Sequence, residues 1–364
     1  MSINIDIIEN NTKQSFNRWP IDGLEMLAHC PVCGGEDRKI LHSELVDNVF
    51  CVAPGKWNLW ECISCRSAYL DPRPTPKFIH FAYAKYFTHT EAATEVDYSL
   101  LSKYRKFRRR LANGYVTWRY SSQNSKPASA FGVVAALFMP KLRNALDRRY
   151  RNLPKLPRDG GRLLDVGCGN GSFLKLARDC GWEVVGLDPD PKAVHNASGL
   201  GLTVYEGGIE FFDGKSELFD VVTLNHVIEH VHNPIEVLTA CHVLLRPGGQ
   251  LWIETPNIDS LGHALFQKNW FDLDPPRHLV LFNRRSLHRA IVSAGFTSFR
   301  YHARPNPCMD RFKSCFAMEC GLSGLQQMKM SKVMWLQTKL VIFTEWLIST
   351  RREFLTVSAS KAEK

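Results

Sequence analysis

One short stretch limits the possible folds of this chain more than any other: Leu163-Leu-Asp-Val-Gly-Cys-Gly-Asn-Gly. An apolar strand runs into a loop that contains Gly167, Gly169 and Gly171, and a helical pattern starts at Ser172. Glycine adopts positive φ angles easily and lets a ligand approach the backbone closely. Because open α/β sheets bind ligands at the carboxyl ends of their strands, this stretch predicts a ligand site in a parallel sheet.

The residues around this loop alternate between short apolar strands and helices, which is the pattern of repeated βαβ units. We expect strands at 162–166, 183–187, 202–205, 219–224 and 250–254, and helices at 172–180, 191–198, 234–245 and 285–294. Apolar runs such as Asp220-Val-Val-Thr-Leu fit strands that are buried on both faces. The predicted fold class is α/β: a Rossmann-like, mostly parallel sheet with helices on both faces.

Changes in composition divide the 364 residues into five zones. We expect a polar leader at 1–28, a small module with two cysteine pairs at 29–76 and a basic helical segment at 77–157. The α/β domain follows at 158–304, and a helical extension at 305–364. The stiff stretch Asp71-Pro-Arg-Pro-Thr-Pro marks the end of the cysteine module.

The cysteine pairs are Cys30-Pro-Val-Cys33 and Cys62-Ile-Ser-Cys65, separated by 28 residues. Four thiolates at this spacing suit a structural, tetrahedral Zn²⁺ site in a zinc-ribbon-like module. A metal-free remnant of such a module, or a redox site, is the alternative. Residues 1–17 contain no apolar signal segment, so we expect a cytoplasmic protein whose other cysteines are free thiols.

Positive charge is concentrated in one segment. The formal charge is +10, yet residues 103–158 hold 15 Lys or Arg against one acid, so the rest of the chain sums to −4. Such a segment attracts phosphates, on an anionic membrane surface or on nucleic acid. We favour a peripheral position at the inner face of the membrane, since no RRM, KH or helix-turn-helix signature occurs. A solvated basic helix face is the plain alternative, and the apolar stripe at 333–348 indicates core packing or a homodimer contact.

Two acids flank the glycine loop: Asp165 just before it, placed to receive a cationic amino group, and Asp188 at the end of the next strand. Downstream come Phe219-Asp-Val-Val-Thr-Leu-Asn-His-Val-Ile-Glu-His and Leu244-Leu-Arg-Pro-Gly-Gly-Gln-Leu. Ser172 stands where the dinucleotide fingerprint has its third glycine. In this order, over residues 161–296, the set resembles the class I S-adenosylmethionine-dependent methyltransferases.

The resemblance implies a cofactor, S-adenosylmethionine, and a role for each matching residue. The methionine part would be framed by Asp165, Gly167, Cys168, Gly169 and Gly171, and the ribose by Asp188 with the adjoining Pro189. Gly208 and Ile209 would meet the adenine, and Asn225 would lie beside the sulfonium. Many members of the family carry an acid where this chain has Gly208.

The candidates for acid–base work are His226, Glu229, His230 and His278. The first three are expected to open a helix and to share one face of it. They resemble the ubiquinone-pathway O-methyltransferases, in which an acid three residues before a Glu-His pair helps to hold a divalent metal. Here His226 replaces that acid, which disfavours a Mg²⁺-type site. The structural alternative is that Glu229 and His230 cap or brace loops around the pocket, and that His278 fixes its own loop through internal hydrogen bonds.

A last cluster, at 255–282, resembles the lid segment of methyltransferases from glycan and secondary-metabolite pathways. It makes Asn257, Trp270 and Arg277 the substrate candidates. We therefore expect O-methylation of a sugar, glycolipid or related small metabolite. The alternatives are C-methylation of a nucleotide sugar, since some sugar C-methyltransferases carry a similar zinc module, methylation of nucleic acid or protein, and a zinc-bearing scaffold without activity.

Overall fold

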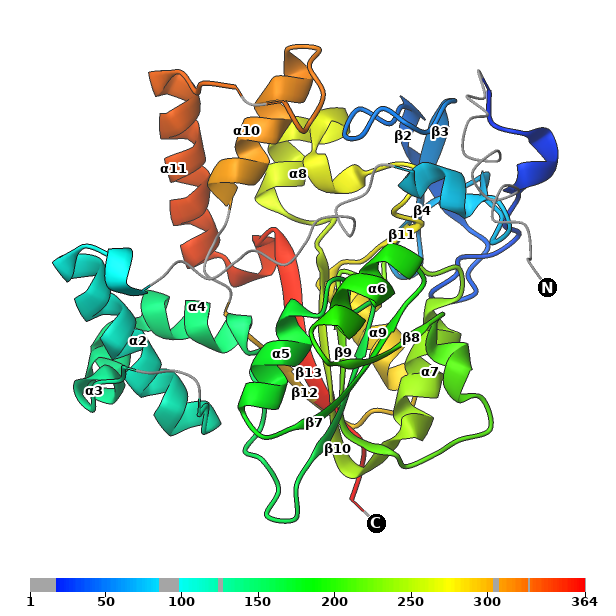
Figure 1. The fold of residues 1–364 in the computed structure, drawn as a ribbon. Coiled ribbons are helices and arrows are strands. Elements are labelled where there is room, and N and C mark those ends of the chain that lie inside the picture. Colours follow the sequence, from blue (N-terminus) through cyan, green and yellow to red (C-terminus); the bar gives the residue numbers. More distant parts are fainter. Residues whose placement is uncertain (1–17, 85–97, 124–126, 304–307, 327, 364) are drawn as a thin grey trace, which may run out of the picture.

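The computed structural model describes residues 18–84, 98–123, 127–303, 308–326 and 328–363 (Figure 1). The expected leader at 1–28 thus lies mostly outside the described residues. At the centre is a seven-stranded sheet of order β12-β13-β10-β9-β6-β7-β8. The strands running parallel to one another are β6 (Arg162–Val166), β7 (Glu183–Asp188), β8 (Thr203–Glu206), β9 (Phe219–Asn225) and β10 (Leu245–Pro256). The predicted α/β class is confirmed.

The C-terminal residues complete this sheet. Strand β13 (Phe354–Ser360) pairs antiparallel with both β10 and β12 (Ser298–Tyr301). Ending the α/β domain at 304 and expecting only helices beyond was therefore wrong. Every residue of β13 except Ser360 is buried, so this strand forms part of the core of the α/β domain.

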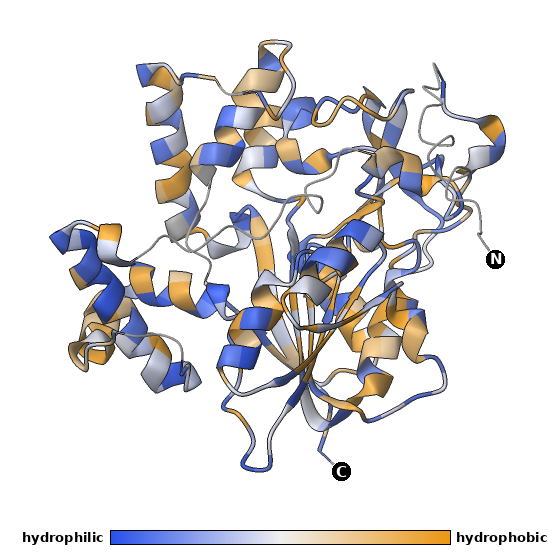
Figure 2. Ribbon diagram, in the orientation of Figure 1, coloured by the Kyte–Doolittle hydropathy of each residue, from blue (hydrophilic) through white to orange (hydrophobic). Residues whose placement is uncertain are grey.

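Helices cover both faces of the sheet, as expected. Leu163 and Val221 share a core with α5 (Ser172–Asp179), whereas their neighbours Leu164 and Val222 face α7 (Pro234–Leu244) and α9 (Arg284–Ser293). The chain crosses between strands through α6 (Pro191–Gly199) and the short helix η5 (Ile209–Phe212). Figure 2 shows the apolar residues gathered along the strands and on the helix sides that face them.

The N-terminal module is joined to the α/β domain by a shared sheet. Strands β2 (Arg38–Leu45), β3 (Trp57–Cys62) and β4 (Ala68–Leu70) are extended by β11 (Val280–Leu281), which comes from the lid region. Two further strands, β1 (Leu24–Glu25) and β5 (Arg73–Pro74), pair with each other. Along the chain, η1 (Ile21–Gly23) directly precedes β1, and η2 (Ile79–Tyr83) follows β5. The module is thus fixed to the lid and is not a free appendage.

The basic segment forms helices η4 (Tyr98–Leu100), α2 (Lys103–Tyr120), α3 (Phe131–Phe138) and α4 (Pro140–Arg149). Its buried aromatic residues belong to the core on the α5 side of the sheet. The hydroxyls of Tyr115 and Tyr120 both donate to Asp147 Oδ1, over 2.8 and 2.7 Å, so the one acid of these helices is engaged internally.

The lid region contains three short helices: α8 (Leu261–Phe266), η6 (Gln267–Asn269) and η7 (Phe271–Leu273). The helices near the C-terminus pack against them: α10 (Cys308–Glu319) and α11 (Lys332–Leu347), followed by η8 (Ser349–Arg351). Phe266 of α8 packs edge-on against Phe312 and Phe316 of α10. In the described part of the chain, no helix combines the length and the apolar content that crossing a bilayer requires.

Candidate functional site

The glycine-rich loop joins β6 to α5 at the carboxyl end of the sheet. Gly167, Gly169 and Gly171 have φ angles of 68°, 55° and 76°, in the left-handed region that favours glycine. A Cβ atom on Gly167 would lie 2.5 Å from Val227 Cγ2, whereas one on Gly169 would meet open space. Cys168 between them is buried, and burial raises the pKa of its thiol. The loop thus offers open backbone surface at Gly169.

Asp188 ends β7 beside this loop. Its Oδ2 accepts a hydrogen bond of 2.7 Å from the Gly169 amide, and its Oδ1 accepts one of 3.0 Å from the Asp190 amide. Burial raises the pKa of the carboxyl, and these two bonds oppose that effect. The adjoining Pro189 is exposed. The Asp188 carboxylate therefore fixes the loop, and its contact with a ribose stays a prediction.

Asp165 and Arg151 form an ion pair beneath the loop, with side chains 0% and 9% exposed. Arg151 Nη1 donates to Asp165 Oδ1 and, over 2.7 Å, to Thr223 Oγ1. Asp165 Oδ2 has no hydrogen-bond partner among the described residues, and burial raises the pKa of this carboxyl. Since buried carboxylate oxygens normally accept hydrogen bonds, the free Oδ2 fits the cationic amino group of a methionine-like ligand.

Arg151 lies in the candidate site, whereas its sequence context predicted only a place on the basic surface. Its guanidinium lies 3.8 Å from the centroid of the Phe173 ring, at the start of α5. Of its nitrogens, Nη1 alone has a hydrogen bond to a described residue. The remaining N–H groups are suited to an anion such as a carboxylate. The available signal was the position of Arg151, a few residues before the strand that leads into the glycine loop.

His226 follows β9 with a φ angle of 55°, a left-handed conformation that is uncommon for a residue other than glycine. Its Nδ1 lies 3.1 Å from Glu229 Oε1, and its Nε2 lies 3.6 Å from Glu254 Oε1. Arg148 of α4 donates to both oxygens of Glu254, over 2.7 to 3.1 Å. Burial lowers the pKa of His226, but the two carboxylates outweigh burial and raise it above the usual 6.5.

The segment from His226 to His230 is a turn, so the prediction that it opens a helix was wrong; α7 begins only at Pro234. The turn still brings His226 and Glu229 together. Glu229 is 0% exposed, and its Oε2 accepts a hydrogen bond of 2.9 Å from Thr255 Oγ1. Burial acts to raise the pKa of Glu229, but the bond with His226 lowers it to about 2. Glu229 is therefore ionised.

His230 and His278 lie together on the other side of Glu229. Nδ1 of His230 is 2.9 Å from the Tyr83 hydroxyl, and the two imidazole centroids are 4.7 Å apart. Burial, with His278, lowers the pKa of His230 to about 4. Ligand atoms of Glu229, His230 and His278 all lie within 4.8 Å of one another. One carboxylate and two imidazoles suit a metal such as Zn²⁺ or Fe²⁺ better than Mg²⁺.

The residues expected near the adenine lie at the start of η5. The Gly208 amide donates to Glu210 Oε1 over 2.7 Å, and a Cβ atom on Gly208 would lie 2.5 Å from Glu210 Oε2. Glu210, which sequence analysis did not single out, therefore lies against the backbone of Gly208. Asn225 ends β9 and pairs in register with Glu254. It thus lies next to His226 and its partner Glu254.

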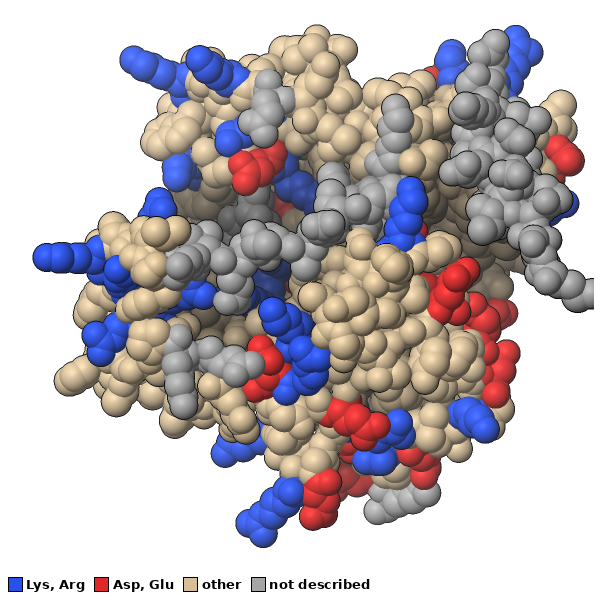
Figure 3. All heavy atoms as spheres, in the orientation of Figure 1, with Lys and Arg blue, Asp and Glu red and all other residues tan. Residues whose placement is uncertain are grey.

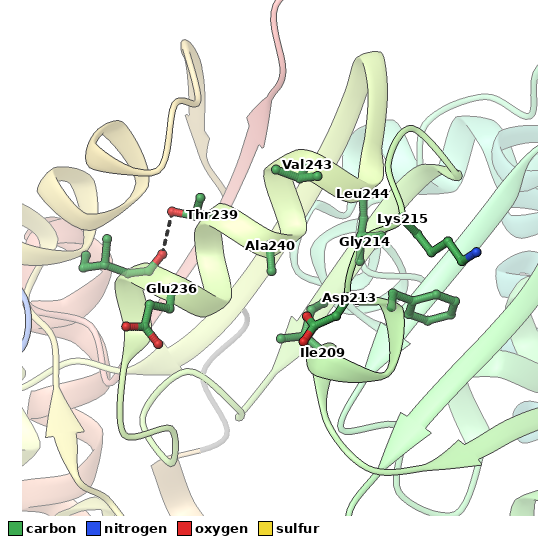
Figure 4. A pocket seen from close by; sticks show the side chains of 11 residues that line it. Ile209, Asp213, Gly214, Lys215, Glu236, Thr239, Ala240, Val243 and Leu244 are labelled. Atoms are coloured by element: carbon green, nitrogen blue, oxygen red, sulfur yellow. Dashed lines mark hydrogen bonds between the residues drawn. The ribbon is translucent and has the colours of Figure 1, made fainter.

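Figure 4 shows a pocket of about 360 Å³ between η5 and α7. Thr239 Oγ1 in its wall donates to the Ile235 carbonyl over 2.8 Å. Of the residues predicted to bind the cofactor, Ile209 alone lines this pocket. No residue of the glycine loop lines this pocket; its walls come from η5, the segment before β9, and α7.

All three substrate candidates are engaged within the protein. Asn257 is 0% exposed, and its amide donates to the carbonyls of Thr350 and Arg352. Trp270 is 2% exposed and donates from Nε1 to Glu353 Oε2 over 2.8 Å. Both side chains brace the lid against the segment that leads into β13.

Arg277, the third candidate, is 0% exposed and uses all five N–H groups inside the protein. Nε donates to Asp274, Nη1 donates to Asp47 and to the Ala82 carbonyl, and Nη2 donates to Asp47 and Asp274. The guanidinium also lies 4.4 Å from the centroid of the Phe50 ring. Arg277 therefore ties the N-terminal module to the lid, and a contact with substrate would require one of these bonds to break.

The four cysteines of the N-terminal module converge. Sγ of Cys30 lies 3.7 Å from Sγ of Cys65, Sγ of Cys33 lies 3.5 Å from Sγ of Cys62, and all four lie within 4.8 Å of one another. A tetrahedron with Zn–S bonds of about 2.3 Å has sulfur–sulfur edges of about 3.8 Å. The cluster has the size that a Zn²⁺ ion requires.

Comparison with known proteins agrees with this geometry. A family described as "Methyltransferase domain" matches residues 138–299. A Methylocella silvestris protein named ubiquinone biosynthesis O-methyltransferase is 30% identical over 197 residues, which cover 47% of this chain and 77% of that protein. A Cereibacter sphaeroides protein of the same name is 40% identical over 116 residues, which cover 30% of this chain. That match spans only about half of the relative, 47%.

Among solved structures, a methyltransferase from Archaeoglobus fulgidus that depends on S-adenosylmethionine aligns with a TM-score of 0.42 and 20% identity, over 64% of this chain and all of that one. The sequence relationship to the Methylocella protein, over three quarters of its length, is the decisive comparison. Together with the glycine loop and its two flanking acids, it shows that the chain belongs to the class I S-adenosylmethionine-dependent methyltransferases.

Proposed function

We propose that this chain methylates a hydroxyl oxygen of a small-molecule acceptor. S-adenosylmethionine supplies a methyl group that its sulfonium already activates; the chain binds this cofactor and prepares the acceptor. The observation that carries the proposal is the buried Asp165 carboxylate: one oxygen pairs with Arg151, and the other has no hydrogen-bond partner among the described residues.

Each end of the cofactor has a counterpart in this chain. Asp165 Oδ2 would accept from the amino group, and the unused N–H groups of Arg151 would bind the carboxylate. Asp188 would hold the ribose, as carboxylates do at the corresponding strand end of Rossmann-like folds. The remaining contacts would come from the backbone or small side chains of Gly167, Cys168, Gly169, Gly171, Pro189, Gly208, Ile209 and Asn225.

His226 is our candidate for the general base. Its imidazole is 24% exposed, which leaves it accessible to an acceptor, and Glu229 and Glu254 lie next to it. When His226 takes the proton of the acceptor hydroxyl, these carboxylates stabilise the imidazolium. The low pKa of His230 makes this second histidine a poorer proton acceptor, so with His278 it is a candidate metal ligand.

For the acceptor we propose a sugar, glycolipid or related metabolite. The names of the Cereibacter and Methylocella relatives support O-methylation. Transfer of labelled methyl groups to lipid-linked glycans, sugar nucleotides, phenols, RNA and protein would test this choice. Label that stays bound to carbon in a sugar nucleotide would favour C-methylation, and label in RNA or protein would favour the remaining alternative.

We also propose one structural Zn²⁺ on Cys30, Cys33, Cys62 and Cys65, and a cytoplasmic location. The spacing of the four sulfurs supports the ion. Metal analysis of the purified chain should give about one zinc per molecule. With Cys62→Ser, less than half of that amount should remain.

Calorimetric titration with S-adenosylmethionine and with S-adenosylhomocysteine tests the function most directly. The wild type should bind both, and Asp165→Ala should lose at least about tenfold in affinity. Asp220→Ala is the matched control, because Asp220 lies at the other end of β9 from the site and pairs with Arg246. A wild-type chain that binds neither compound would leave only the scaffold alternative.

A further inference from the structure

Helix α3 turns its large apolar side chains outward. Its buried positions are Gly132 and Ala136. The exposed positions hold much larger residues, with exposed fractions between 50% and 82%: Phe131, Val134, Leu137 and Phe138. A helix of a water-soluble domain normally shows the reverse arrangement, with its large apolar side chains facing the core. Neighbouring exposed apolar side chains of this size mark a surface that contacts a partner.

This orientation is fixed by close packing against α2. A Cβ atom on Gly114 of α2 would lie 1.8 Å from the Ser129 carbonyl oxygen, and one on Gly132 would lie 2.1 Å from the Leu111 carbonyl oxygen. The backbones of the two helices are therefore in direct contact. No space is left between them for a side chain of the size of phenylalanine or leucine, so the apolar face of α3 stays on the surface.

Positive charge surrounds the apolar face. Helix α2 carries seven Lys or Arg and α4 carries four, whereas the three helices together carry one acid, Asp147. In Figure 3 the Lys and Arg side chains gather on the side of the molecule where α2 and α4 lie, and acidic side chains gather mainly at the lower right. Helix α2 also exposes Tyr104, Phe107 and Trp118, by 60% to 67%.

We propose that helices α2, α3 and α4 form a docking surface for an anionic lipid bilayer. The apolar side chains of α3 enter the headgroup boundary, and the cations of α2 and α4 contact lipid phosphates. Exposed aromatic residues on α2 suit the same boundary. The apolar face favours a bilayer over nucleic acid, because a phosphate backbone offers no apolar layer in which phenylalanine and leucine side chains could be buried.

The same segment reaches the candidate site. Helix α4 supplies Arg148 to Glu254, and two residues after its end Arg151 pairs with Asp165. A docked α4 would thus hold the cofactor site close to the bilayer surface. This step rests on the proposed function, whereas the docking surface itself does not.

Sedimentation with vesicles tests the surface. The full chain should bind vesicles that contain about one third phosphatidylglycerol, and should bind pure phosphatidylcholine at least about tenfold more weakly. Phe138→Ser should weaken binding about tenfold, and Val134→Ser by less. Val292→Ser is the matched control: Val292 is 47% exposed, close to the 50% of Val134, but lies on α9.

The charges are tested in the same way. Arg105→Gln with Arg108→Gln should weaken binding at least about tenfold at low salt, whereas Arg285→Gln with Arg289→Gln on α9 should not. Titration with S-adenosylmethionine keeps the two proposals apart, because none of these variants should lose the cofactor. Retention of the wild type by RNA but not by anionic vesicles would overturn the proposal. So would a dimer in sedimentation velocity that Phe138→Ser dissociates, because a second copy would then cover α3.

Discussion

Arg151 donates to Asp165 through Nη1, and its other N–H groups have no hydrogen bond to a described residue. If these groups bind the carboxylate of the cofactor, the loss of Arg151 should weaken only cofactors that carry this carboxylate. Arg151→Met should lower the affinity for S-adenosylmethionine about 10- to 100-fold, because a charged hydrogen bond is lost. Decarboxylated S-adenosylmethionine should bind the wild type and the variant with similar affinity. Calorimetry with both compounds measures the difference. An equal loss for both would mean that Arg151 acts only by holding Asp165.

The pKa of His226 predicts the direction of a pH effect. Glu229 and Glu254 raise this pKa above 6.5, and a base must be neutral, so the methylation rate should rise with pH through that raised value. In Glu229→Gln the pKa falls and the acidic limb of the kcat profile moves to lower pH. The imidazolium also loses support, so the maximal rate should drop about 10- to 100-fold. Glu236→Gln, an exposed acid in the first turn of α7, is the control; an unmoved limb would exclude His226 as the base.

The residues of the site differ in how well the sequence reveals them. Asp165, the three glycines and Asp188 lie within 24 consecutive residues, so their order alone indicates a cofactor loop. Arg148 pairs with Glu254 across 106 positions, and such a contact leaves no local pattern. Arg277 was predicted to meet substrate because it is polar and lies in the lid. Only the fold shows that the Arg277 guanidinium already donates to Asp47, which lies 230 positions away in the sequence.

The close contact between α2 and α3 predicts the effect of a substitution at Gly114, and helix propensity alone would not predict it. Gly114→Ala should destabilise the protein by about 1–3 kcal/mol, because the added Cβ has no room beside Ser129. Gly199→Ala in α6 is the matched control: its Cβ meets nothing within 4 Å, so this change should stabilise by about 0.5–1 kcal/mol. Urea unfolding measures both. A stable Gly114→Ala protein would mean that the two helices separate easily.

The five strands and four helices expected between residues 162 and 294 are all present, because each has its own apolar pattern, although β10 begins five residues earlier than expected. Helix α5 was expected at 172–180 and spans Ser172–Asp179, for example. Strand β12 was not predicted. Strand β13 was missed because its short sequence, which includes Leu355, Thr356 and Val357, does not indicate which other strand it pairs with. Its place between β10 and β12 depends on long-range pairing. The two-residue strand β11 was missed for the same reason, since its partner β4 lies in the N-terminal module.

The whole chain should unfold as one unit, because β11 and the Arg277 cluster join the N-terminal module to the lid. Asp47 carries much of this connection: it accepts from the amides of Phe50, Val52 and Ala53, and Arg277 lowers the pKa of its carboxyl although burial acts to raise it. Asp47→Asn removes one of the two carboxylates that pair with the buried Arg277, which costs about 1.5–3 kcal/mol.

Far-ultraviolet circular dichroism and tryptophan fluorescence, followed together in urea, should report one coincident transition that Asp47→Asn shifts to lower urea. Glu44→Gln is the control within the same module: its ion pair with Lys56 is more than 60% exposed on both sides, so its loss should cost less than about 1 kcal/mol. Removal of zinc by a chelator should lower the same single midpoint, since the module and the lid share a sheet. Two separate transitions, with the module melting first and the remaining midpoint unchanged in Asp47→Asn, would mean that the module folds independently and that Arg277 transmits no stability across the shared sheet.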